Sequence, residues 1–135
     1  MSMNFIYDFQ IKLHQLFSND KEIRLTVDRI YLSIVQDAKY PFLLINILKI
    51  ENMSKFNNPI YDIEFEICAF ARDKNQGILV SLADKITNKL NSKTYILKDY
   101  IIAGMRAGNI TFKPSIDLIT TKLSVNYKAL IKKDI

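Results

Sequence analysis

Apolar residues recur along this chain with two kinds of spacing, one helical and one extended. Near the N-terminus they fall three and four positions apart, which predicts a helix with one buried face. The members of this face are Ile6, Phe9, Leu13, Leu16 and Phe17. The same spacing returns over residues 76–90, at Leu79, Leu82, Ala83, Ile86 and Leu90. The pattern therefore predicts two amphipathic helices, one at the N-terminus and one past the middle of the chain.

Elsewhere the pattern changes to the alternation that is typical of strands. Stretches rich in β-branched and aromatic residues predict strands over 27–34, 42–50, 60–70, 106–112 and 119–131. The third is the clearest, because its odd positions are apolar whereas Asp62, Glu64 and Glu66 are charged. Residues 52–59, which contain Ser, Asn and Pro, predict a loop before it.

The predicted order of elements is α-β-β-β-α-β-β. It indicates an α+β domain with a mostly antiparallel sheet and helices packed on one face. We expect the first three strands to be antiparallel, because the connections between them are short. The chain has 135 residues, 49 % of them apolar and 24 % charged, which fits one globular domain over residues 1–135.

The charged side of the third strand is the main candidate for interactions. Asp62, Glu64 and Glu66 share one face, but neighbours in this row are about 6.5–7 Å apart, too far to hold one small ion easily. Lys122 and Lys128 share a face of the last strand and are natural partners for the row if the two strands are neighbours. We expect Glu64 and Lys122 to form such a pair. These five residues are our candidate subunit interface.

The chain shows no pattern that indicates catalysis. It has no phosphate-binding loop, no nucleophile–base pair and no metal-ligand motif, so we predict that it is not an enzyme and uses no cofactor. His14, the one histidine, is interpreted as a surface or subunit-contact residue rather than a metal ligand. The single Cys68 lies in an apolar alternating run and is predicted to be a small buried hydrophobic residue.

Two further features bear on location. The longest apolar run, residues 42–45, is far shorter than the roughly 18–20 residues that cross a bilayer, so we expect no membrane partner. One cysteine and no secretory leader predict a reducing, cytoplasmic environment.

The formal net charge of +5 is unevenly distributed. Residues 1–71 carry seven Lys and Arg against nine Asp and Glu, whereas residues 72–135 carry twelve against five. Such asymmetry is compatible with a nucleic-acid-binding face. The lysines are dispersed, however, and no aromatic RNA-binding signature accompanies them, so solvated faces and contacts with an acidic neighbouring subunit explain them better. A non-sequence-specific nucleic-acid-binding α+β module is the alternative interpretation.

Four landmarks occur in a fixed order along the chain. After the N-terminal helix come Arg29-Ile30-Tyr31 and then Pro41-Phe42-Leu43-Leu44-Ile45, each at a predicted strand. The long alternating strand leads into the helix at 76–90, and the last strand ends in Tyr127-Lys128-Ala129-Leu130. In this order and spacing, over residues 5–131, the chain resembles the small tail-completion or tail-terminator proteins of long-tailed bacteriophages and gene transfer agents. It departs from them in having Phe70 near the place of a frequent Trp, and in being rich in Lys, Ile and Asn.

The resemblance implies a structural assembly protein of a phage, prophage or gene transfer agent. Such proteins cap the tail tube and join the tail to the head connector as a ring, commonly a hexamer. The implied partners are further copies of the chain, the tail-tube protein and the head-completion or connector protein. DNA would pass through the ring without sequence readout. The implied location is the host bacterial cytoplasm during assembly and the particle tail afterwards.

Overall fold

The structure, a computed structural model, describes residues 4–33, 35–72, 76–91, 94–114, 117 and 119–133. It has three helices and six strands, which form one sheet. In chain order they are α1 (Asn4–Ser18), α2 (Lys21–Thr26), β1 (Arg29–Tyr31), β2 (Phe42–Asn52), β3 (Ile60–Arg72), α3 (Gln76–Leu90), β4 (Tyr95–Ile96), β5 (Tyr100–Pro114) and β6 (Thr120–Lys133). The α+β class is confirmed, and the predicted order lacks only the short elements α2 and β4.

The sheet has the order β1-β2-β3-β6-β5-β4. All neighbouring pairs are antiparallel except β1 and β2, which are parallel. The prediction that the first three strands are antiparallel is therefore wrong for this pair. The reason is that the chain between β1 and β2 returns to the end of the sheet where β1 began, and there the Asp28 N–H donates to the Pro41 carbonyl at 2.7 Å.

The predicted strand over 27–34 is also largely wrong. A short helix, α2, comes directly before this segment and ends at Thr26. The Asp20 side chain caps the start of α2 by accepting a hydrogen bond from the Ile23 N–H at 3.1 Å. Only Arg29–Tyr31 pair as a strand, and Ile34 lies outside the described residues.

The fifth strand is longer than the alternation predicts. It spans Tyr100–Pro114 rather than 106–112, and two register shifts, at 102–104 and 107–110, interrupt its pairing with β6. Each shift inverts the inward and outward positions, so the sequence shows no continuous alternation there.

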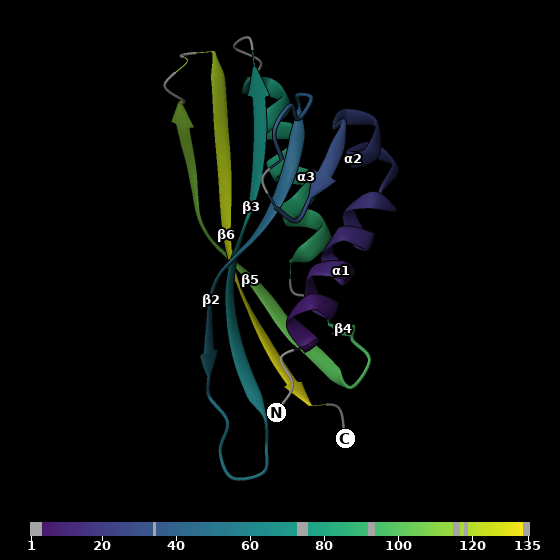
Figure 1. The fold of residues 1–135 in the computed structure, drawn as a ribbon, viewed down its shortest axis with the longest axis vertical. Coiled ribbons are helices and arrows are strands. Elements are labelled where there is room, and N and C mark those ends of the chain that lie inside the picture. Colours follow the sequence, from purple (N-terminus) through teal and green to yellow (C-terminus); the bar gives the residue numbers. More distant parts are fainter. Residues whose placement is uncertain are drawn as a thin grey trace.

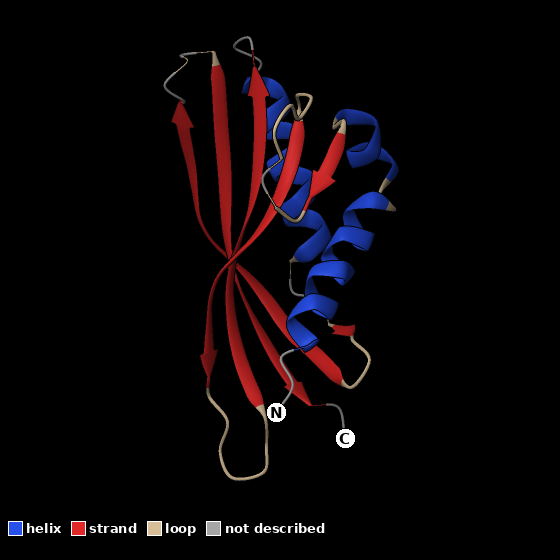
Figure 2. Ribbon diagram, viewed as in Figure 1, coloured by secondary structure: helices blue, strands red, loops and turns tan. Residues whose placement is uncertain are grey.

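The helices α1 and α3 pack on the same face of the sheet, as predicted (Figure 2). Between them and the sheet lies the core, in which Phe9, Phe65 and Tyr127 are completely or almost completely buried. The Phe65 ring stacks on Tyr127, with centroids 5.3 Å apart, and meets the Phe9 ring edge-on. The helix stripes that the sequence assigns to the interior are buried, except for Ile6 and Leu16, which are only partly buried. The odd positions 61–69 of β3 and 123–131 of β6 are buried as the alternation predicts, whereas Ile119, which the same alternation assigns to the interior, is 49 % exposed.

Strong twist gives the sheet two differently exposed ends. In Figure 1 the strands cross near the middle of the view, and the β2–β3 hairpin extends below the helices at the end where the termini lie. β5 and β6 extend at the opposite end. Residues 53–59 connect β2 to β3, as the sequence predicts. Within the described chain no helix has the length and apolar character needed to cross a membrane.

Candidate interaction surface

One face of the sheet, here called the open face, points away from the helices. Along β3 its residues alternate with the buried core positions, so Asp62, Glu64 and Glu66 lie on it in a row. β6 is the direct neighbour of β3, and Lys122 and Lys128 lie on the same face of β6. The structure therefore brings all five predicted interface residues onto one surface.

The pairing within this row differs from the prediction. Lys122 lies opposite Phe70 in the register and forms an ion pair with Glu66, with Nζ 3.7 Å from Oε1. Glu64 lies opposite Lys128 instead. The expected Glu64–Lys122 pair is thus wrong, because the antiparallel register between β3 and β6 decides which charges meet.

Glu66 is the centre of a polar network on the open face. The Ser124 hydroxyl donates to its Oε2 at 2.7 Å and the Asn46 Nδ2 donates to its Oε1 at 3.1 Å. Burial by itself raises the pKa of Glu66, but the hydrogen bonds from Ser124, Asn46 and Cys68 and the charge of Lys122 offset it, so the pKa lies below 4.5. Glu66 therefore stays ionised and binds β2, β3 and β6 together.

Cys68 is completely buried beside this network, as predicted. Its Sγ lies 3.9 Å from the Ser124 hydroxyl. Burial, and next the negative charge of Glu66, raises the pKa of the Cys68 thiol from 9.0 to about 12. The side chain is therefore a neutral thiol at physiological pH and no nucleophile.

Farther along the open face, the β5 bulge leaves a hollow of about 420 Å³. Glu64, Arg106, Asn126 and Lys128 line it together with the backbone of the bulge. Two of the predicted residues, Glu64 and Lys128, thus meet at one place. Sequence reasoning missed Arg106, because its place depends on the register between β5 and β6, which sets it opposite Lys128.

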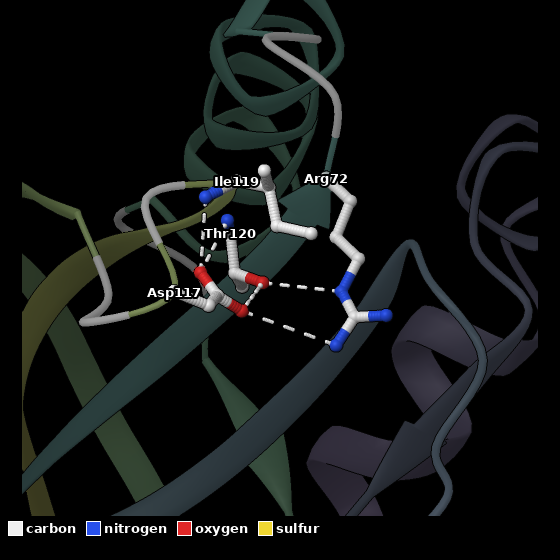
Figure 3. Close-up of polar contacts among 4 residues, drawn as sticks. All are labelled: Arg72, Asp117, Ile119 and Thr120. Atoms are coloured by element: carbon white, nitrogen blue, oxygen red, sulfur yellow. Dashed lines mark hydrogen bonds and ion pairs between the residues drawn. The ribbon is translucent and has the colours of Figure 1, made fainter.

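A second polar cluster closes the sheet at the end where β6 begins (Figure 3). Asp117 accepts hydrogen bonds from the backbone N–H groups of Ile119 and Thr120, at 3.0 and 2.9 Å, and from the Thr120 hydroxyl at 2.7 Å. Arg72, at the end of β3, donates from Nε to the Thr120 hydroxyl at 3.1 Å and approaches Asp117 to 4.0 Å. The Thr120 side chain and backbone hold the pKa of Asp117 below its ordinary value of 3.8.

Aromatic rings continue this cluster across β3 and β2. The Arg72 guanidinium lies 4.2 Å above the centre of the Tyr40 ring, and Phe42 stacks on Phe70 with centroids 4.7 Å apart. Together with Asp117 they border a hollow of about 390 Å³. The sequence signal was present in the aromatic residues at 40, 42 and 70, but their gathering depends on the β2–β3 register.

The interpretation of His14 as a surface or subunit-contact residue needs correction in its first part, because the side chain is partly buried; a subunit contact stays a prediction. His14 is half-buried between α1 and β1, with Nε2 3.1 Å from the Ile30 carbonyl oxygen and Nδ1 3.2 Å from the Ser18 hydroxyl. Since a carbonyl only accepts, Nε2 carries the proton and Nδ1 accepts from Ser18. The ring ties the first helix to the edge of the sheet.

The surface carries charged, polar and aromatic groups. Its groups form ion pairs, hydrogen bonds and ring contacts, and within the described residues no three His, Cys, Asp or Glu side chains gather as a metal site would require.

Comparisons with known proteins bear on the fold. No protein-family model matches the chain, and no curated protein matches it in sequence. A chain in the structure of the virion of a native gene transfer agent particle, however, has the same fold. The two superpose with a TM-score of 0.80 over 89 % of this chain and 91 % of that chain, at 10 % sequence identity. At that identity the likeness establishes a shared architecture along nearly the whole of both chains.

Proposed function

We propose that this chain is a structural assembly protein of a phage-like particle. In this proposal it caps the tail tube and joins the tail to the head connector as a ring, commonly a hexamer. The supporting observation is the shared fold with a chain of a gene transfer agent particle, which extends over nine-tenths of both chains. The landmarks from Arg29-Ile30-Tyr31 to Tyr127-Lys128-Ala129-Leu130 lead to the same class of particle.

The shape of the molecule suits a protein that joins two different partners. At one end of the sheet the loop of residues 53–59 presents Phe56, whose side chain is fully exposed at a backbone φ of 55°. Ser54 fixes the base of this loop, because its hydroxyl oxygen accepts from the Ile60 N–H at 2.9 Å. The other end presents Arg72 and Asp117. An uncharged aromatic ring at one end and an ion pair at the other suit different surfaces, as a tail tube and a connector would require.

The proposal includes the setting of this activity. The chain acts as a single domain over residues 1–135, is no enzyme and needs no cofactor. It is made in the host bacterial cytoplasm and becomes part of the tail in the mature particle. DNA passes through the ring and contacts it without sequence readout, so no base-reading side chains are required.

The test is to mix the purified chain with the tail-tube protein of the same particle, and to measure mass by light scattering and tube length by electron microscopy. We expect a ring-sized species on tube ends and tubes that stop growing. A matched variant, Phe56→Ser, changes only the exposed tip of the 53–59 loop and reports whether that tip contacts the tube. A chain that neither binds tubes nor alters their length contradicts the proposal.

A second function is favoured by the distribution of charge on the open face. The β5–β6 half carries five cationic side chains, Arg106, Lys113, Lys122, Lys128 and Lys132. Such a band could attract phosphates without reading bases. DNA affinity that falls steeply with salt concentration, in a chain that ignores the tube protein, would support this module and displace the assembly role.

A further inference from the structure

In the part of the chain that the structure describes, two strand segments at the margins of the sheet have no strand beside them. β5 pairs with β4 only at Ile101 and Ile102, and β2 pairs with β1 only over residues 42–44. Among the described residues, this leaves one side of β5 over 106–114 and of β2 over 46–52 without a strand neighbour; these are the β5 edge and the β2 edge. In Figure 1 they are the outermost strands on the side away from α1, at opposite ends of the long axis.

Both edges expose apolar side chains. On the β5 edge, Ile110 and Phe112 are each 50 % exposed, although they lie opposite the buried Val125 and Leu123 in the register. On the β2 edge, Leu48 is 46 % exposed at the bulge in this strand. Apolar groups gathered at unpartnered strand edges are typical of interfaces rather than of a solvated surface.

The charges near the two edges are of opposite sign. The β5–β6 half of the open face carries Arg106, Lys113, Lys122, Lys128 and Lys132. The β2–β3 half carries Glu51, Asp62, Glu64 and Glu66 together with Lys49 and Arg72. Two β5 edges brought together would place cations against cations, whereas a β5 edge beside a β2 edge places cations near carboxylates. Electrostatics therefore favour contact between unlike edges.

We propose that copies of this chain associate head to tail, with the β5 edge of one copy packed along the β2 edge of the next. A bulge interrupts each edge, at 107–110 in β5 and at 47–49 in β2, so an unlimited backbone ladder is blocked and the side chains select the partner. Every copy keeps one edge of each kind, so the contact repeats until rotation closes a ring. The inference rests on the proposed function, which requires a ring, and names the surfaces that form it.

The test uses one variant for each edge. Phe112→Glu places a carboxylate on the β5 edge and Leu48→Glu places one on the β2 edge. Leu25→Glu, on α2 and 76 % exposed, is the matched control away from both edges. All three side chains are at least 46 % exposed, so folding should be retained, and circular dichroism with thermal unfolding checks this for each variant.

The oligomeric state of each variant is then measured as mass by light scattering, first without and then with the tail-tube protein. We expect the wild type and Leu25→Glu to form the same ring, and each edge variant alone to lose every species larger than one chain. An equal mixture of Phe112→Glu and Leu48→Glu should give a species of two chains and nothing larger, since only one intact contact can form.

Several results would overturn the inference. It would be overturned if either edge variant still formed rings, or if the mixture of the two variants remained monomeric. It would also be overturned if the wild type remained monomeric even on tail tubes. Dimers of Leu48→Glu alone would indicate that like β5 edges pair instead. Tube capping by the edge variants would refute the edge contact and leave the proposed function standing. Rings that depend on both edges but never bind tubes would refute the proposed function and leave the edge contact.

Discussion

Lys122 on β6 forms an ion pair with Glu66 on β3, with its Nζ 3.7 Å from Glu66 Oε1. The other oxygen of the same carboxylate accepts a hydrogen bond from the Ser124 hydroxyl at 2.7 Å. The Glu66 side chain is 14 % exposed and that of Lys122 is 31 % exposed. The hydrogen bonds are therefore the better protected part of this network, and the ion pair is partly screened by water.

Replacing Glu66 should destabilise the fold more than replacing Lys122. In Glu66→Ala the buried Ser124 hydroxyl and the Asn46 amide lose their acceptor, which we expect to lower the free energy of unfolding by about 1–3 kcal/mol. Lys122→Met should cost less than about 1 kcal/mol. Urea denaturation measures both. Glu64→Ala serves as the control, and a loss there as large as in Glu66→Ala would contradict the assignment.

Lowering the pH should reduce the free energy of unfolding, because Glu66 becomes protonated. Its pKa in the folded state lies below the ordinary value of 4.5, so the unfolded chain binds its proton first as pH falls. The contribution to stability is complete above pH 4.5 and is lost as pH falls through the folded pKa. Urea midpoints of wild type and Glu66→Gln should therefore differ more at about pH 7 than at about pH 3. An equal difference at both would show that Glu66 does not titrate in this way.

Cys68 should report unfolding. Because the thiol is fully buried and its pKa is raised to about 12, almost none of it is thiolate at neutral pH. We expect a thiol reagent to label the native chain orders of magnitude more slowly than the urea-unfolded chain. Mass spectrometry measures the extent of labelling over time. Rapid labelling of the native chain would contradict the burial of Cys68.

Tyr127 carries a hydroxyl that the core does not use. Burial raises the pKa of Tyr127 from 10.0 to about 12, and Thr87 lowers it. The Thr87 hydroxyl, however, donates to the Ala83 carbonyl, and among the described residues the Tyr127 hydroxyl has no hydrogen-bond partner. Tyr127→Phe should therefore leave the free energy of unfolding unchanged or raise it by up to about 1 kcal/mol.

The neighbouring ring supplies the comparison for this prediction. Phe65→Ala removes the ring stacked on Tyr127 and should cost about 3–5 kcal/mol. Both variants are measured by urea denaturation. A loss above about 1 kcal/mol in Tyr127→Phe would indicate that the hydroxyl has a partner after all.

Local periodicity determined much of the architecture. The spacing of Phe9, Leu13 and Phe17 places a helix and its buried side correctly, and the alternation in β3 puts Glu66 outside and Phe65 inside. Such patterns are readable because each residue's face depends only on its neighbours in the chain. The same local rule identified the row of carboxylates as a surface, but it places Cys68 on that same side, so the burial of Cys68 follows from its tertiary surroundings and not from the alternation.

Only the tertiary structure decided how the segments meet. Three features relate residues far apart in the chain: the parallel pairing of β1 with β2, the bulges of β5, and the register of β3 with β6 that brings Lys122 near Glu66. So does the gathering of Arg106 beside Glu64. Periodicity carries no information about which strand lies beside which, because every register that buries the same face satisfies the same alternation. Packing of the helices and strands selects one of them.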